Sequence, residues 1–197
     1  MFCAKCKQKK CYVKGQNCTN FTSSDIDDAY SEDRLAIMKA AACTEGRFYN
    51  NLTRLEETVE FCKAMRYQKI GIAFCIGLSE EAKLIDEYLA KFFTVHSVCC
   101  KVCGISKDHL GLQQIKPDTR ETMCNPLLQA EILKQNNVEF SVTVGLCVGH
   151  DALFTRACQM PVSCLVAKDR VLAHNPLGAV YSRYWRRKLG IHPQDQV

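Results

Sequence analysis

The chain has 197 residues, of which 47% are hydrophobic and 24% are charged, and its formal net charge is +5. This length and composition are those of a globular protein with one α/β domain and a small appendage. No apolar run reaches the eighteen or more residues of a membrane span, and the first residues lack the apolar stretch of a signal peptide, so we expect a cytoplasmic protein without a membrane partner.

The positive charge is concentrated at the two ends of the chain, between the first cysteines and in residues 183–188. Clustered basic residues can indicate nucleic-acid binding. Here the excess is small and no nucleic-acid motif accompanies it. We therefore interpret the C-terminal cluster as a solvated helix face and do not expect a nucleic-acid partner.

The chain contains fourteen cysteines. A reducing cytoplasm keeps thiols from pairing as disulfides, so this number indicates metal ligands or redox chemistry. Some of the cysteines are expected to be small core residues, because free cysteine is among the most buried residue types.

Residues 1–23 are the first predicted unit, a cysteine-rich knuckle. Its cysteines are Cys3, Cys6, Cys11 and Cys18, and they lie among lysines with almost no apolar residue nearby. A bound metal would have to supply the folding free energy of such a segment, so we predict a metal site of four thiolates. The spacing matches neither a zinc ribbon nor a ferredoxin run, and the alternative is a disordered, reduced chain end.

Residues 24–67 are predicted to form a helical arm packed on the core. Ser31 is the expected N-cap of a first helix, which Gly46 should end, and a second helix should start near Asn51. Cys43 and Cys62 lie on or beside the apolar faces of these helices, so we interpret both as packing residues.

Residues 68–197 are predicted to be an α/β domain. Strands are expected over 69–75, 93–98, 140–146 and 162–167, and helices over 79–92, 126–135 and 150–158, with a last helix reaching residue 189. Alternating strands and helices favour a parallel sheet with right-handed crossovers. We expect a flavodoxin-like three-layer sandwich with a mainly parallel four-stranded sheet in the order 2-1-3-4, whose switch point lies between the first and third strands.

Cysteines follow three of these strands. Cys75 ends the first, Cys99 and Cys100 end the second, Cys147 follows the third, and Cys124 opens the helix that leaves the second. Neighbouring strands are about 4.8 Å apart, so these sulfurs can share one pocket at the carboxyl edge of the sheet. We predict that Cys100, Cys124 and Cys147 are metal ligands, with Cys75 as the candidate fourth.

Other residues near this edge are candidates for the pocket. Cys99, Cys103 and His174 are expected to line it, although Cys100-x2-Cys103 could instead be a thioredoxin-like redox pair and His174 a turn residue. His150 is the third residue past Cys147 and Asp151 follows it, and we predict a catalytic role for both, in supplying a proton or in orienting a bound group.

Six segments carry a resemblance to a known family. They are the N-terminal CxxCx4C knuckle, IGIAFCIGL, SVCCKVCG, MCNP, GLCVGHD and KDRVLAHNP. Together they resemble a family of small cysteine-rich proteins of anaerobic microbes, catalogued as a domain of unknown function and often labelled predicted metal-binding. The resemblance covers nearly the whole chain. It implies a metal or iron–sulfur centre and no settled reaction.

The expected function is iron–sulfur redox or cluster-dependent chemistry, with a small-molecule substrate or a redox partner protein, because such clusters are held by cysteine thiolates. A zinc-binding or metal-handling protein without turnover is the alternative. A third hypothesis is an interaction module that uses the basic C-terminal helix. Whether the protein is an enzyme stays open at this point. No GxGxxG follows the first strand, so we do not expect a flavin or a dinucleotide.

Overall fold

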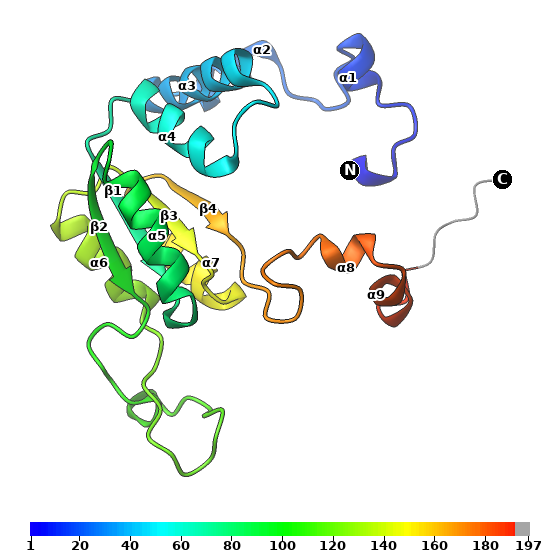
Figure 1. Cartoon of the computed structure of the whole chain (residues 1–197). Helices are drawn as coiled ribbons and strands as arrows, with labels where there is room; N and C mark the ends of the chain where they lie inside the picture. The colour runs from blue at the N-terminus through cyan, green and yellow to red at the C-terminus, as the bar shows by residue number, and fades with distance from the viewer. Residues whose placement is uncertain (192–197) are drawn as a thin grey trace.

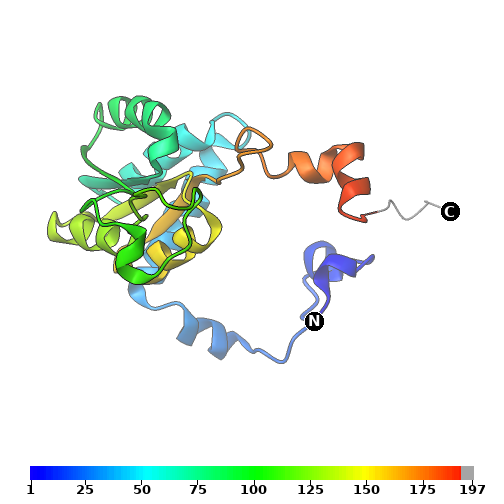
Figure 2. The ribbon, with the colours of Figure 1, turned by 90° about the horizontal axis from the view of Figure 1, so that it is seen from below.

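The computed structural model describes residues 1–191; residues 192–197, the end of the predicted α/β domain, lie outside the described part. The body of the molecule is an α/β unit from which both ends of the chain project (Figures 1 and 2). The N-terminal projection contains a 3-10 turn (Cys3–Lys5), α1 (Lys10–Lys14) and α2 (Ser23–Ala29), none of which has a buried residue. No helix within residues 1–191 combines the length and apolarity needed to cross a membrane.

The centre of the body is a four-stranded parallel sheet. Its strands are β1 (Lys69–Phe74), β2 (Thr94–Cys99), β3 (Phe140–Val144) and β4 (Val162–Val166). They are arranged in the order β2-β1-β3-β4, and every neighbouring pair is parallel. The predicted fold class and strand order are thereby confirmed.

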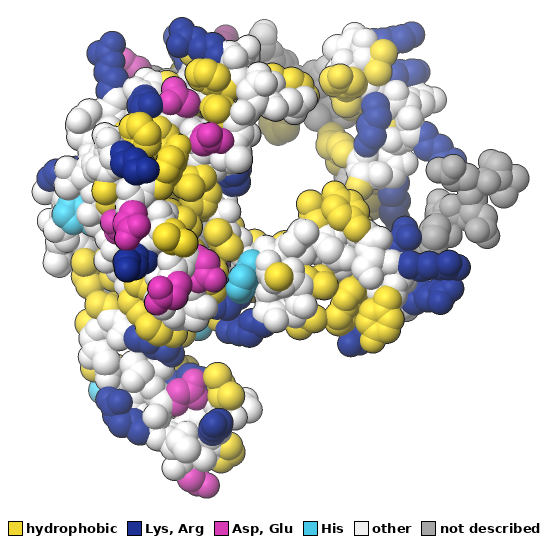
Figure 3. Space-filling model, in the orientation of Figure 1, with side chains coloured by type: hydrophobic (Ala, Val, Ile, Leu, Met, Phe, Trp, Pro, Cys, Tyr) yellow, Lys and Arg dark blue, Asp and Glu magenta, His cyan; other side chains and the backbone are white. Residues whose placement is uncertain are grey.

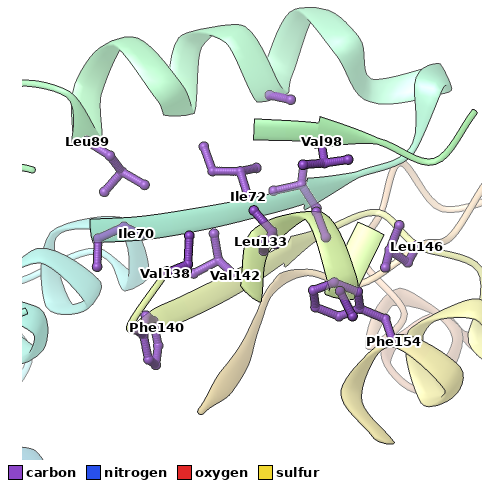
Figure 4. Packing of buried hydrophobic residues seen from close by; sticks show 14 of the residues in the cluster. Ile70, Ile72, Leu89, Val98, Leu133, Val138, Phe140, Val142, Leu146 and Phe154 are labelled. Carbon is purple, nitrogen blue, oxygen red and sulfur yellow. The ribbon is translucent and has the colours of Figure 1, made fainter. Parts of the chain in front are cut away.

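The two inner strands are apolar because helices cover both of their faces, as expected for a central parallel strand. All five residues of β3 are buried, and so are the middle residues of β1. Their side chains form the core together with Leu89, Leu133 and Phe154 from the helices (Figure 4).

The helices of the body cover the two faces of the sheet. Helix α5 (Ser79–Leu89) packs on β1 and β2, and on the other face α6 (Pro126–Gln135) packs beside α7 (Val148–Ala157) (Figure 1). Before the sheet come α3 (Glu32–Phe48) and α4 (Arg54–Ala64), which pack on each other. Helix α4 reaches the sheet through Phe61, whose ring lies 5.5 Å from that of Phe140.

Helix α3 differs from its prediction. It continues through Gly46 to Phe48, because one glycine costs a helix only about 1 kcal/mol and does not by itself end it. Its buried residues are Ala40 and Thr44, which are one turn apart, and the Cys43 side chain is exposed. The interpretation of Cys43 as a packing residue was therefore wrong, whereas Cys62 is fully buried as expected.

The C-terminal projection also differs from the single helix expected. It consists of α8 (Gly178–Tyr181) and α9 (Arg183–Lys188), because the chain turns at Ser182, whose hydroxyl caps α9 by accepting from the Trp185 N–H. Lysine and arginine side chains gather on this projection (Figure 3).

Candidate functional site

The carboxyl edge of the sheet holds Cys75 and Cys100 in fixed positions. Phe74 is the last residue of β1 and pairs with Cys99 on one side and Val144 on the other. The hydrogen bonding continues one residue further, since the Cys100 N–H donates to the Phe74 carbonyl (2.8 Å) and the Cys75 N–H to the Val144 carbonyl (3.0 Å). Both thiols are nearly inaccessible, at 2% exposure for Cys100 and 7% for Cys75.

Cys124 is brought to the same edge by a hairpin-like excursion, residues 101–123. An isolated antiparallel bridge between Ser106 and Thr122 joins the two sides of its stem, and the Lys101 ammonium donates to the Thr122 carbonyl at 2.6 Å. The excursion closes where the Asn125 N–H donates to the Cys100 carbonyl at 2.8 Å. Asn125 then caps α6 through the Leu128 N–H, so Cys124 is held between Cys100 and a helix start.

Cys147 is positioned by the turn after β3. Gly145 has a φ of +64°, which favours glycine, and a Cβ there would meet the Leu78 side chain at 2.8 Å. The Gly145 N–H donates to the Val166 carbonyl of β4, which fixes the turn. Cys147 follows as the N-cap residue of α7.

Three of these thiols interact directly. The hydrogen bond with Cys100 is the main cause that lowers the pKa of Cys75 to about 4 and that of Cys124 to about 5, against the opposing effect of burial. The same contacts with Cys124 and Cys75, together with burial, raise the pKa of Cys100 well above its usual range. Cys100 therefore keeps its proton while its two neighbours are thiolates at neutral pH.

Two cations from the segment after β4 face the sulfurs. The Lys168 ammonium donates to the Cys75 sulfur, and the Arg170 guanidinium to the Cys147 sulfur, both at 3.1 Å. The Cys147 sulfur, and more weakly the charges of Cys75 and Cys124, raise the pKa of Arg170. All three of these cysteines thus lie near one guanidinium, and the charge of the thiolates is offset by basic side chains.

Sequence reasoning missed Lys168, Arg170 and the nearby Lys101, whose charge also lowers the pKa of Cys124. One sequence signal points to Lys168 and Arg170: they belong to the segment Lys-Asp-Arg that directly follows the fourth strand. Residues that follow any strand of a parallel sheet reach its carboxyl edge.

His174 shapes the loop that carries these cations. Its Nδ1 accepts from the Asp169 N–H at 3.1 Å, and the Asp169 carboxylate accepts from the N–H groups of Val171 and Leu172 at 2.9 Å. This contact gives His174 a place in the turn, and its predicted role in lining the pocket stays a prediction.

His150 and Asp151 lie in the first turn of α7, beside the thiols. The charge of His150 is one of the causes that lower the pKa of Cys124, which places the imidazole near that sulfur. The Asp151 N–H donates to the Cys147 carbonyl, and the Asp151 Oδ1 atom is buried without a hydrogen-bond partner among the described residues.

The remaining predicted site residues do not join this cluster of thiols. The Cys99 sulfur accepts from the Lys101 N–H at 3.4 Å, and Cys103 is exposed in a turn with a φ of +72°. The thiols that influence the pKa of Cys100 are those of Cys124 and Cys75, and the redox pair of Cys100 with Cys103 stays a prediction.

The four N-terminal cysteines, Cys3, Cys6, Cys11 and Cys18, are all exposed. The pKa of Cys6 is lowered by hydrogen bonds from the N–H groups of Lys9 and Gln8. Neither in this segment nor elsewhere in residues 1–191 are three or more Cys, His, Asp or Glu side chains arranged around one position suited to a metal ion. Metal binding at the knuckle and at the sheet edge therefore stays a prediction.

A comparison with protein-family models matches residues 14–165 to DUF1847, described as a protein of unknown function. The chain belongs to this family. An uncharacterized protein of Methanocaldococcus jannaschii is 47% identical over 190 residues, which cover 96% of this chain and 98% of the relative. No solved structure matches the chain. The resemblance to an uncharacterised family is thereby confirmed.

Proposed function

We propose that the carboxyl edge of the sheet is a metal centre held by cysteine thiolates. Cys75, Cys100 and Cys124 would be its ligands, with Cys147 as the fourth. The observation that carries the proposal is the gathering of cysteines from separate segments at one edge, where the Ile76 N–H donates to the Cys100 sulfur and Lys168 and Arg170 donate to the sulfurs of Cys75 and Cys147. The neighbouring Cys100 thiol also lowers the pKa of Cys75 and of Cys124. A thiolate, and not a thiol, is the form that binds a metal.

The donor set and its surroundings fit a soft metal. Thiolates favour zinc, copper(I) and iron–sulfur clusters over hard cations such as magnesium or calcium. The basic side chains of Lys101, Lys168 and Arg170 offset the negative charge that several thiolates bring together. A metal bound there would take the place of the proton that Cys100 now keeps.

The leading occupant is an iron–sulfur cluster. A cluster held by cysteines would supply electron transfer and, with fewer than four firm ligands, an open iron position for a small molecule. The His150 imidazole, which lies near Cys124, would form a hydrogen bond with a group bound at that position. The unpartnered Asp151 Oδ1 would accept a hydrogen bond from a bound group or from water.

Zinc is the second candidate. A structural zinc site takes four thiolates in a closed tetrahedral arrangement, and Cys75, Cys100, Cys124 and Cys147 would supply four sulfurs at this edge. In this alternative the protein binds or transfers metal without turnover.

Anaerobic purification distinguishes the two occupants. We expect a brown protein that contains iron and acid-labile sulfide; a colourless protein with stoichiometric zinc would contradict the cluster and support the second candidate. Replacing Cys100 by Ser should remove the metal of this centre, whereas Cys43→Ser, at an exposed cysteine of α3, should leave it in place. If the protein binds neither metal, or if both variants retain the same metal content, the centre is not at this edge.

A further inference from the structure

A cavity lies between the helical arm and the sheet, away from the cysteines. It has a volume of about 510 Å³ and is lined by residues of α3, α4 and the connection between them, together with Phe140 and Ser163. Phe140 is the first residue of β3 and Ser163 the second of β4, so the cavity is near the amino ends of these strands. The thiols lie at the opposite, carboxyl edge, and the cavity is therefore a separate site.

The floor of the cavity is aromatic. The rings of Phe61 and Phe140 pack with their centres 5.5 Å apart, and Phe48 at the end of α3 contributes a third ring. A volume of this size is within the range of ligand pockets, which are typically apolar with a few polar groups that orient the ligand.

Three charged side chains also line the cavity: Glu45, Arg54 and Glu57. Arg54 is already engaged, because its Nε donates to the Cys164 carbonyl (2.9 Å) and its Nη2 to the Ser163 hydroxyl (2.8 Å). Within residues 1–191 neither glutamate forms an ion pair with a lysine or arginine. The cavity therefore combines an aromatic floor with two carboxylates that have no cationic partner.

We infer that this cavity binds a small organic cation, an ammonium group that carries an aromatic or alkyl body. The body would cover the rings of Phe61 and Phe140, and the ammonium would lie between the carboxylates of Glu45 and Glu57. Aromatic faces attract cations as well as apolar groups, so the floor and the carboxylates favour the same ligand. With the positive charge of Arg54 included, the three charged side chains give the cavity a net charge of −1, which favours a cation over an anion.

The test is a binding titration of the full-length protein, followed by calorimetry or ligand-observed NMR. The probes are 2-phenylethylamine, benzylamine and hexylamine, with 3-phenylpropionate as the anion of matching shape. We expect at least one amine to bind more tightly than the propionate. Glu57→Gln, which removes a charge with little change of shape, should weaken that amine by roughly three- to tenfold.

The matched control is Glu60→Gln. Glu60 is on the same helix but pairs with Lys63 and does not line the cavity. It should leave amine binding unchanged. A second variant, Ala41→Leu, fills the cavity from a position exposed on α3 and should abolish binding without lowering the thermal midpoint.

The inference is overturned if no amine binds, if the propionate binds as well as the amines, or if the two glutamine variants behave alike. Metal content does not enter this experiment, so its outcome is independent of the centre at the sheet edge.

Discussion

At the scale of single residues, Cys100 and Cys62 show how neighbours decide the state of a buried thiol. Both are almost inaccessible. Cys62 is in an apolar environment, and burial raises its pKa to about 12. Cys100 has two thiols as neighbours, and its hydrogen bonds lower the pKa of each of them. Burial alone favours the protonated, unreactive thiol, whereas a hydrogen bond from a neighbouring thiol favours the thiolate.

Replacing Cys100 by Ala tests this directly. The hydrogen bond with Cys100 is the main cause of the lowered pKa of Cys124, so its loss should return this pKa towards the ordinary value of a thiol. In metal-free protein the pH profile of iodoacetamide alkylation at Cys124, followed by peptide mass spectrometry, should move to higher pH. Cys62→Ala, at an equally buried cysteine in α4, is the control and should leave the profile in place. An unchanged profile in Cys100→Ala would mean that other groups set the pKa.

The cysteines of this site could be predicted from sequence because each follows an apolar run that had to be a strand, or precedes the helix start that Asn125 and Pro126 mark. For Lys168 and Arg170 the sequence gives only their place directly after the fourth strand, because a basic residue in a loop has no pattern that tells a solvated side chain from one that contacts a sulfur. Cys43 was misread for a related reason. The buried face of α3 is chosen by its contact with α4, and these contacts leave Leu35 and Met38 exposed.

At the scale of elements, the turn after β3 and the start of α7 differ in their tolerance of a side chain. Gly145→Ala should destabilise the protein by about 1–3 kcal/mol, because the positive φ strains alanine and the new Cβ meets Leu78. Gly149→Ala is the matched change: no atom lies within 4 Å of a Cβ there, and the position is helical. Urea unfolding should show a loss for the first and no loss for the second. Equal midpoints would show that the turn is not strained.

The buried Cys62 of helix α4 should lower the stability of the folded protein at alkaline pH. Its pKa is raised from 9 in the unfolded reference to about 12 in the folded protein. The unfolded chain therefore loses the Cys62 proton at a lower pH than the folded protein does. The contribution of Cys62 to the free energy of unfolding is complete below pH 9 and falls as pH rises towards 12, by about 1.4 kcal/mol per pH unit. Denaturant unfolding in reducing buffer between pH 8 and 11 should show this decline, and Cys62→Val, which cannot titrate, should decline less. Parallel curves for the two proteins would contradict it.

At the scale of the whole molecule, the body and the projections differ in how they are stabilised. Every residue from 1 to 30 is exposed, including Phe2 and Tyr12, so this segment contributes no buried apolar surface. The sheet, by contrast, has a continuous core of its own. The predicted division into a knuckle, a helical arm and an α/β domain stays a prediction, and the contrast between residues 1–30 and the sheet suggests an experiment.

Deleting residues 1–30 should leave the body folded, with a free energy of unfolding within about 1 kcal/mol of the full chain, because no core contact is lost. Metal analysis of the same protein should show the loss of the knuckle's metal alone. The corresponding point variants, such as Cys6→Ser and Cys11→Ser, should reproduce the metal loss. If the truncated protein also lacks the metal of the sheet edge, the knuckle provides ligands to that centre and the two sites are one.

The excursion of residues 101–123 leaves the body at Cys100 and returns to it at Cys124. Its two ends are joined by the bond from the Asn125 N–H to the Cys100 carbonyl, and its stem by the bridge from Ser106 to Thr122. We therefore expect residues beyond this bridge to have little influence on where the two sulfurs lie. The far part of this excursion is thus separated from the site by these two contacts. Residues can be inserted or deleted there in evolution, or in the laboratory to attach an affinity tag or a fluorescent label. We expect the distance between the Cys100 and Cys124 sulfurs to stay the same.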